Sequence, residues 1–185
     1  MILDLLSLAR IESGVELFQY EPVPVAPVVH ACLERHQTRA ETRKQTLAIG
    51  ATNGTPPEKD DDLAVWADEE ALDQILDNLV DNALKYTPEG GQVRVSWTVT
   101  DDQVCLEVSD TGIGIPAADL ARIFERFYRV DKDRSRELGG TGLGLSIVKH
   151  LAQAMHGTVR ASSVPDKGST FYVCLPRAGQ PDVVG

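Results

Sequence analysis

The chain reads Asp110-Thr111-Gly112-Ile113-Gly114 and, further along, Gly140-Thr141-Gly142-Leu143-Gly144. Both segments follow an apolar helical pattern that carries Asn78 and Asn82 one turn apart. Taken singly these features are unspecific, because glycine pairs mark many turns and asparagine is common on helix surfaces. Their order and spacing together indicate a nucleotide site.

The composition is that of one globular domain. A length of 185 residues is enough for a well-buried core, and 42% of the residues are apolar. No stretch approaches the roughly 18 to 20 apolar residues of a membrane span, and the start of the chain has no basic region or cleavage site. We therefore expect a soluble, cytoplasmic piece. The formal charge of −10 argues against a general basic surface for nucleic acid, so any phosphate ligand has to be held locally.

Three cysteines stand far apart in the sequence, at Cys32, Cys105 and Cys174. Their number is odd, and their surroundings are apolar or alternating. We predict buried free thiols in preference to a metal or redox site.

Apolar periodicity and the positions of glycine and proline predict the order of the elements. Helices are expected over residues 3–11, 26–44, 116–124 and 143–155, with one more that follows an N-cap at Asp68. Strands are expected over residues 16–25, 46–49, 64–67, 92–100, 103–109, 158–163 and 169–175. Residues 129–138 are predicted to form a mobile loop and residues 177–185 a disordered tail. The fold class is α/β: a two-layer α/β sandwich with a mixed, mostly antiparallel sheet and about three helices on one face.

The chemistry of a nucleotide site fits these segments. The glycine-rich turn from Gly140 to Leu145 opens a helix, where uncovered backbone amides and the helix dipole suit a phosphate chain. Asn78 and Asn82 share a helix face, and a neutral amide oxygen is a ligand acceptable to magnesium. Lys85 lies one turn beyond Asn82 and can neutralise phosphate charge. The alternatives are a flexible linker before the helix and an ordinary solvated polar face.

Asp110 ends a predicted strand and precedes Gly112. Its carboxylate only accepts hydrogen bonds, which suits an exocyclic amine such as that of adenine. The alternative is that Asp before Gly forms an everyday turn.

Five motifs in order resemble a known family, the catalytic ATP-binding domain of bacterial sensor histidine kinases. Its superfamily includes DNA gyrase and the heat-shock chaperone ATPases, which share the Bergerat-type ATP-binding fold. Residues 78–86 resemble the N box, 110–114 the G1 box, 124–129 the F box, 140–144 the G2 box and 168–170 the G3 element. Residues 5–12 resemble the end of the family's dimerisation helix. The implied domains are that helix end at 1–14, the catalytic domain at 15–177 and a tail at 178–185.

The resemblance implies a role for each matching residue. Asn82 would coordinate Mg2+, with Asn78 supporting the metal or the phosphates, while Lys85 and Arg129 would contact phosphate oxygens. Asp110 would bind the adenine amine, assisted through water by Thr170. The other expected ligand contacts are Tyr86, Gly112, Gly114, Ile115, Phe127, Thr141, Gly142, Leu143, Gly144 and Leu145. Residues 128–141 would form a lid over ATP. The residues expected to be catalytic are Asn78, Lys85 and Arg129.

The implied reaction is transfer of the γ-phosphoryl group of Mg-ATP to a histidine nitrogen. In this family the acceptor histidine precedes an acidic residue on a dimerisation helix, and His30, His36, His150 and His156 all lack that context. We therefore expect the acceptor to lie outside this chain, and the four histidines to have structural or solvated roles. The implied partners are a dimerisation or histidine phosphotransfer domain and a response regulator. The full-length protein is expected to be a homodimer that can be anchored in the inner membrane.

Three alternatives keep the fold. A gyrase-like ATP hydrolase and an anti-sigma serine kinase both place a glutamate one turn before the metal-binding asparagine. Here that position is Asn78, which cannot act as a general base. The third alternative is a nucleotide-binding pseudokinase without turnover. A P-loop motif is absent from the sequence.

Overall fold

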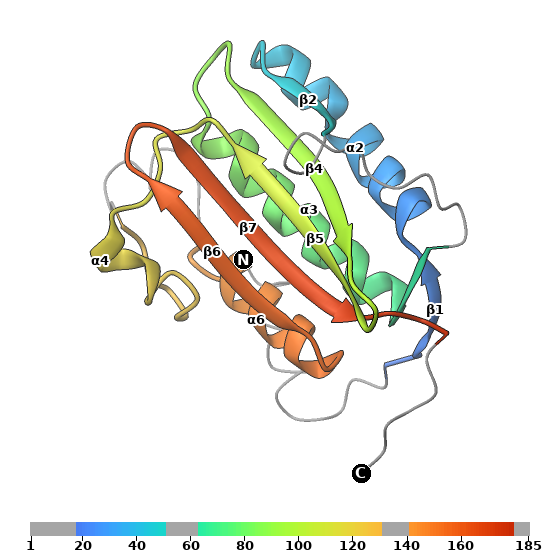
Figure 1. The fold of residues 1–185 in the computed structure, drawn as a ribbon. Helices are drawn as coiled ribbons and strands as arrows, with labels where there is room; N and C mark the ends of the chain where they lie inside the picture. The colour runs from blue at the N-terminus through green and yellow to red at the C-terminus, as the bar shows by residue number, and fades with distance from the viewer. Residues whose placement is uncertain (1–17, 51–62, 131–140, 180–185) are drawn as a thin grey trace.

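The computed structural model describes residues 18–50, 63–130 and 141–179 (Figure 1). A five-stranded sheet has the order β2-β4-β5-β7-β6, and all neighbours are antiparallel except β2 and β4. Its strands are β2 (Thr46–Ile49), β4 (Gln92–Val99), β5 (Gln103–Asp110), β6 (Thr158–Val164) and β7 (Gly168–Pro176). A separate two-stranded sheet pairs β1 (Glu21–Pro24) with β3 (Ala64–Ala67).

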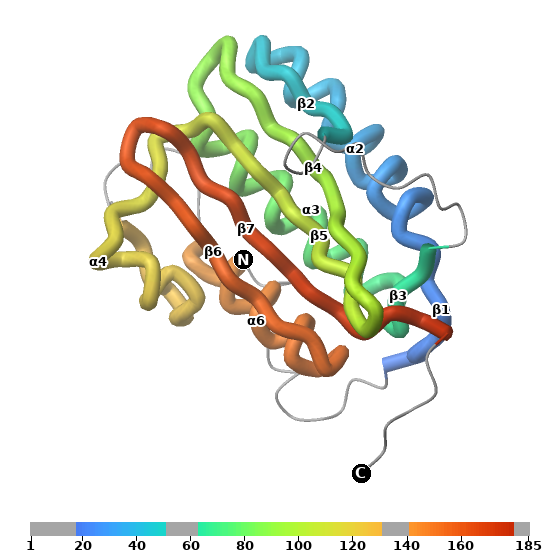
Figure 2. Tube along the Cα trace, viewed as in Figure 1, coloured from blue at the N-terminus to red at the C-terminus, as the bar shows by residue number. Residues whose placement is uncertain are grey.

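Three long helices lie together behind the sheet: α2 (Val25–Thr42), α3 (Glu69–Tyr86) and α6 (Gly144–Ala154) (Figure 1). The short α4 (Ala117–Leu120) lies beside β6, and Figure 2 traces the chain from the end of β5 through α4 toward α6. The predicted two-layer sandwich and mostly antiparallel sheet are confirmed. In the described part of the chain, no helix combines the length and apolarity that crossing a membrane would require.

Local sequence accounts for α3, the helix that carries the two asparagines. Asp68 is its N-cap, and the Asp68 carboxylate accepts a hydrogen bond from the Ala71 amide at 2.9 Å. At the other end the Thr87 hydroxyl donates to the Ala83 carbonyl at 2.7 Å, and Pro88 follows. The predicted apolar face is buried, and it consists of Leu72, Ile75, Leu76, Leu79, Val80 and Ala83. Burial of this face fixes which side of α3 is left for polar groups.

The alternation of β5 decides where Asp110 lies. Val104, Leu106 and Val108 are buried toward the helices, while the residues between them are partly exposed. Asp110 continues the buried row, since side chains two residues apart share a face of a strand. A carboxylate therefore ends an otherwise apolar row on the helix-covered side of the sheet.

Several element boundaries differ from those predicted. In the described part of the strand predicted over 16–25, only Glu21–Pro24 is a strand, and Val25 already begins α2. The helix predicted over 116–124 is regular only from Ala117 to Leu120 and continues as turns. The Ala178 amide still donates to the Ala64 carbonyl at 2.9 Å, so the chain remains hydrogen-bonded where the tail was predicted to begin. The predicted helix 3–11, most of the loop 129–138 and residues 180–185 lie outside the described residues.

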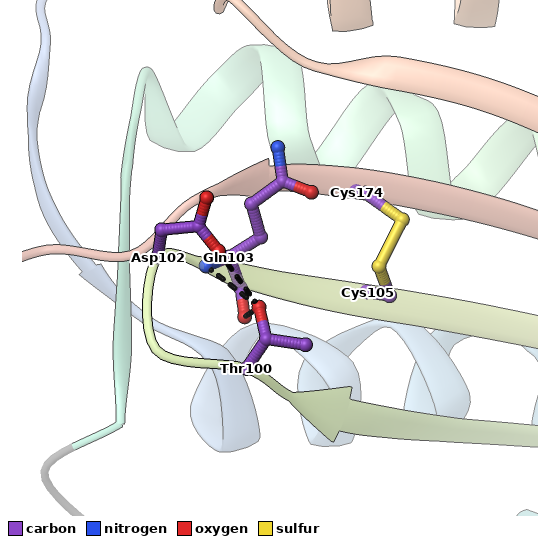
Figure 3. Close-up of a disulfide and its surroundings, with 5 residues drawn as sticks. All are labelled: Thr100, Asp102, Gln103, Cys105 and Cys174. Atoms are coloured by element: carbon purple, nitrogen blue, oxygen red, sulfur yellow. Dashed lines mark hydrogen bonds between the residues drawn. A yellow bond between two sulfur atoms is a disulfide. The ribbon is translucent and has the colours of Figure 1, made fainter.

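The prediction of free thiols is wrong for two of the cysteines. Cys105 and Cys174 form a disulfide between β5 and β7, on the sheet face opposite the helices (Figure 3). They are direct register partners although 69 residues separate them in sequence, so the spacing alone does not show the pairing. Figure 3 also shows the nearby hairpin turn, where the Gln103 amide donates to the Thr100 hydroxyl at 3.1 Å. Cys32 is free and buried, as predicted.

Candidate functional site

Asp110 lies where the end of β5 meets the start of β7. It is 8% exposed, and its Oδ1 accepts hydrogen bonds from the Gly112 amide at 2.7 Å and the Ser169 amide at 3.3 Å. Burial raises the pKa of this carboxyl, while the two hydrogen bonds act in the opposite direction. Because both of these bonds fall on Oδ1, Oδ2 is the oxygen available to a donor on a ligand.

Backbone segments approach closely around Asp110. Gly168 has φ +109°, and a Cβ at this position would lie 1.9 Å from the Asp110 carbonyl oxygen. A Cβ on Gly112 would lie 2.5 Å from the carbonyl oxygen of Tyr86, the last residue of α3. The same Tyr86 oxygen accepts a hydrogen bond from the Ile113 amide at 3.2 Å. The first glycine segment therefore joins the end of α3 to the end of the sheet.

Asn78 and Asn82 face the beginning of α6. A Cβ on Gly144, the first residue of α6, would lie 2.8 Å from Asn78 Oδ1 and 3.7 Å from Asn82 Nδ2. Only a glycine lets the second glycine segment approach the asparagines this closely. The Asn78 amide donates to the Gln74 carbonyl at 2.8 Å, which helps to fix its orientation.

The first turn of α6 has the features of an anion site. Leu143 stands at the N-cap position and makes no side-chain capping hydrogen bond, so the amides of this turn are not covered by a cap. Leu143 itself is fully buried, and its amide donates to the Thr141 hydroxyl at 3.3 Å. Leu145 packs against the core from the same turn. Gly140 lies outside the described residues.

Two basic side chains, Lys85 and Arg129, lie close enough for their charges to interact. Lys85 is 8% exposed, and its pKa is lowered by burial, with Asp81 opposing the shift and the charge of Arg129 adding to it. Arg129 has a buried Nε with no hydrogen-bond partner among the described residues. A buried donor without a partner is costly, and two like charges close together are unfavourable. Both costs are relieved by a polyanionic ligand.

The segments on either side of residues 131–140 lie against each other. The Phe127 amide donates to the Gly142 carbonyl at 2.8 Å, and Phe127 is 61% exposed with φ +60°. Gly142 has φ +74°, and a Cβ there would lie 2.9 Å from the Phe127 Cα. The Tyr128 hydroxyl donates to Asp119 at 2.5 Å, which ties the same segment to α4. These contacts hold together the two segments that flank residues 131–140, and residues 131–140 of the predicted lid are outside the described part.

The predicted role of Thr170 beside Asp110 does not fit the geometry. The Thr170 hydroxyl donates to Ser109 Oγ at 3.1 Å, and Ser109 precedes Asp110 on β5. Because neighbouring residues of a strand point to opposite faces, Thr170 lies on the side of the sheet away from the Asp110 carboxylate. Ser169 is the adjacent residue on the correct face, and its amide contacts Asp110.

Sequence reasoning also missed Ser163. Its hydroxyl donates to the Gly168 carbonyl at 2.8 Å, accepts from the Ile115 amide at 2.8 Å and lies 2.9 Å from Ser169 Oγ. Ser163 and Ser169 are register partners on β6 and β7. The alternation of side chains along the two predicted strands could have indicated it, because that alternation puts both serines on the same face as Asp110. Gly114, with φ +68°, completes this corner, since a Cβ there would lie 2.2 Å from the Val164 carbonyl oxygen.

Comparison with known families agrees with this geometry. The model for histidine kinase-, DNA gyrase B- and HSP90-like ATPases matches residues 67–179. The chain belongs to this ATPase family. The matched residues include α3, both glycine segments and the whole antiparallel part of the sheet.

Similar members of the family are sensor kinases. The chain is 39% identical to the sensor histidine kinase WalK of Bacillus subtilis over 95% of its length, and 38% identical to the sensor-like histidine kinase SenX3 of Mycolicibacterium smegmatis over 98%. It covers 28% and 45% of those two proteins. The chain is therefore similar to less than half of either relative.

Solved structures show the same arrangement. Full-length ShkA in complex with AMPPNP superposes with a TM-score of 0.78 at 32% identity, over 97% of this chain and 35% of ShkA. The Acinetobacter baumannii histidine kinase AdeS gives a TM-score of 0.72 at 26% identity, over 95% of this chain and 76% of that one. The predicted membership of the histidine kinase group of ATPases is confirmed.

Proposed function

We propose that this ATPase-family chain is the catalytic domain of a sensor histidine kinase, which binds Mg-ATP and directs its γ-phosphoryl group to a histidine outside this chain. The main support is the interaction of two like charges, Lys85 and Arg129, in a domain whose α6 begins without a side-chain cap. The like charges suit a triphosphate, as does Arg129 Nε, which has no hydrogen-bond partner within the described ranges, and the full-length relative ShkA was solved with AMPPNP.

The adenine end is supported by Asp110. Its Oδ2 would accept from the exocyclic amine, while Oδ1 stays bonded to the Gly112 and Ser169 amides. Tyr86, Ile115 and the glycines of the first segment would line this end. In place of Thr170, Ser169 is the residue that we propose as the helper of Asp110.

The phosphate end is supported by the asparagine row on α3. Asn82 would ligate Mg2+ and Asn78 would support it, since their neutral amide oxygens add no negative charge beside the phosphates. Leu143 and Leu145 would bring the backbone amides of α6 toward phosphate oxygens, with Thr141, Gly142 and Phe127 at the base of the lid. Bound magnesium neutralises the charge that develops on the transferring group.

The chemical work left to the chain is positioning. Asn78, Lys85 and Arg129 would hold the triphosphate in line with an incoming imidazole nitrogen. Three of the histidines have other contacts, and His30 is exposed on α2. His36 faces Asp77 on α3 at 3.1 Å, and His150 lies 2.7 Å from the Ser146 carbonyl. His156 stacks beside Tyr20. A separate dimerisation domain would supply the acceptor, and a response regulator would receive the phosphoryl group.

Phosphoryl transfer in trans tests this proposal. The chain would be incubated with γ-labelled Mg-ATP, with and without a dimerisation domain from its full-length protein. We expect label only on the added domain, and none when Asn82→Ala replaces the wild type or when EDTA removes the metal. Stable label on the isolated chain, or phosphate release without transfer, would contradict the proposal. The second outcome would favour an ATP hydrolase. ATP binding without either reaction would indicate a pseudokinase.

A further inference from the structure

A cluster of three potential ligands lies between α2 and α3, outside the proposed nucleotide site. Cys32 and His36 stand one turn apart on α2, and Asp77 faces them from α3. Asp77 Oδ1 lies 3.4 Å from Cys32 Sγ and 3.1 Å from His36 Nε2, and the three ligand atoms all lie within 4.8 Å of one another. The neighbouring Asn78 turns instead toward the start of α6.

We propose that Cys32, His36 and Asp77 form a binding site for a zinc-like divalent cation, with water as the fourth ligand. Thiolate, imidazole and carboxylate are a donor set that suits zinc, whereas the asparagine oxygens of the nucleotide site suit magnesium. The two sites would therefore select different ions.

Two of the three spacings match a tetrahedral ion, and the third, between the sulfur and the imidazole nitrogen, is within 4.8 Å. Metal–ligand distances of about 2.3 Å to sulfur and about 2.0 Å to nitrogen and oxygen place the sulfur roughly 3.5 Å and the nitrogen roughly 3.3 Å from the oxygen at tetrahedral angles. The corresponding distances are 3.4 and 3.1 Å. The helices need no rearrangement to bring sulfur or nitrogen to the right distance from oxygen. The i and i+4 positions on α2 are also the usual helical spacing of paired ligands.

Access is compatible with an ion, although the ion has to displace a proton from Cys32. Cys32 is 1% exposed, but the side chains of His36 and Asp77 are 15% and 41% exposed, so an ion can enter from the surface. Burial and the adjacent Asp77 raise the pKa of the Cys32 thiol to about 12, and the thiol donates to the carboxylate. A cation would replace that proton, since a coordinating thiol is deprotonated.

Arg35 is the competitor of the cation for Asp77. Its Nη2 lies 2.9 Å from Asp77 Oδ1 and 2.5 Å from Asp73 Oδ1. Arg35 can keep its ion pair with Asp73 when Asp77 binds the metal. The positive charge of Arg35 and its hydrogen bond to Asp77 nevertheless both disfavour binding of the cation. Removing this guanidinium should therefore tighten metal binding, which a purely structural role of the cluster does not predict.

Cobalt titration of the metal-free chain without nucleotide tests the site, because Co2+ reports thiolate ligation by absorbance. The Cys105–Cys174 disulfide is kept intact, so that Cys32 is the reactive thiol. We expect one bound ion with a sulfur-to-metal band and four-coordinate visible bands, and displacement by Zn2+. Cys32→Ser should abolish the sulfur band, and His36→Gln should weaken binding at least about tenfold.

Matched variants complete the test. His30→Ala removes an exposed histidine from the same helix and should leave the titration unchanged, while Arg35→Gln should bind Co2+ more tightly than the wild type. Circular dichroism and thermal unfolding show whether each variant is folded. The proposal is overturned if the folded wild type gives no sulfur band. It is equally overturned if His36→Gln binds as tightly as the wild type, or if Arg35→Gln binds no more tightly.

Discussion

Asp110→Asn exchanges one carboxylate oxygen for an amide nitrogen, and we expect it to weaken ATP binding specifically. The variant can keep Oδ1 as acceptor for the Gly112 and Ser169 amides, which lie 2.7 and 3.3 Å away in the wild type. In that orientation the new amide group points its hydrogens toward the adenine amine, so donor meets donor. A hydrogen bond to a charged group contributes about 1.5–3 kcal/mol. Its loss corresponds to a roughly 10- to 100-fold increase in Kd for ATP.

The same substitution should change how the stability of the nucleotide-free protein depends on pH. The pKa of Asp110 is raised above 3.8 in the fold, so the folded state binds this proton more tightly than the unfolded chain does. Between the unfolded and folded pKa values, ionisation of Asp110 therefore lowers stability as pH rises. Asp110→Asn has no ionisable group at this position, so its stability does not fall in this way as pH rises. The difference in unfolding free energy, variant minus wild type, should move in favour of the variant as pH rises through that interval.

Calorimetric titration with ATP, GTP and inorganic triphosphate measures the binding effect. We expect the loss to fall on ATP, with triphosphate unchanged and the preference for ATP over GTP reduced, because the new amide can donate to the guanine carbonyl. Asp101→Asn, in the exposed turn between β4 and β5, is the matched control and should bind like the wild type. An unchanged Kd for ATP in Asp110→Asn would refute the placement of adenine at this carboxylate.

Three further predictions follow from the site. Gly168→Ala should lower the unfolding free energy in urea by about 3 kcal/mol or more, because its Cβ would lie 1.9 Å from the Asp110 carbonyl oxygen. Gly90→Ala is the control: its φ is +81° but the space around it is open, so it should cost only about 1 kcal/mol. Equal losses would contradict the steric argument. Lys85→Met should weaken ATP binding. The lowered pKa of Lys85 means that the unfolded chain binds this proton more tightly, so the nucleotide-free wild type should gain stability as pH rises toward 10.5, and the variant should not. A stability profile against pH identical to that of the wild type would count against this role. Ser169→Ala keeps the backbone amide that bonds to Asp110 but removes the hydroxyl on the face of Asp110, and it should raise the Kd for ATP several-fold in nucleotide titration. Thr170→Ala, on the opposite face, should leave the Kd within about twofold, and the reverse ranking would restore the prediction made from sequence.

The elements that sequence predicted well are those with strong local signals. The Asp68 cap and the apolar spacing of α3 are both local, so that helix and its polar face followed directly from the residues. The two antiparallel hairpins were recognisable because alternation and turn residues agree. The glycine segments were placed correctly along the chain, although their contacts with Tyr86 and Asn78 are tertiary and could not be predicted.

The errors come from properties that depend on strand register. Cys105 and Cys174 become neighbours only when β5 and β7 pair, so counting cysteines along the sequence could not reveal the disulfide. Thr170 was placed beside Asp110 because it closes a glycine motif, but a shift of one residue along a strand reverses the face. Ser169 is on the same face as Asp110, and its backbone amide bonds to the carboxylate.

The pairing of β1 with β3 has a mechanical consequence. Val65 of β3 also forms a β-bridge with Arg177, and the Arg177 amide donates to the Asp102 carbonyl at 2.9 Å. As a result, β1, β3 and the residues after β7 lie together at the end of β5 where the β4–β5 hairpin turns (Figure 1). Asp110 stands at the other end of β5, roughly 24 Å away at about 3.4 Å per residue. A rotation of the domain about the hairpin end would therefore displace Asp110 further than any residue near that end. Because the strands are hydrogen-bonded to one another along their length, the sheet would carry a small tilt at the hairpin end to the Asp110 end as a larger displacement.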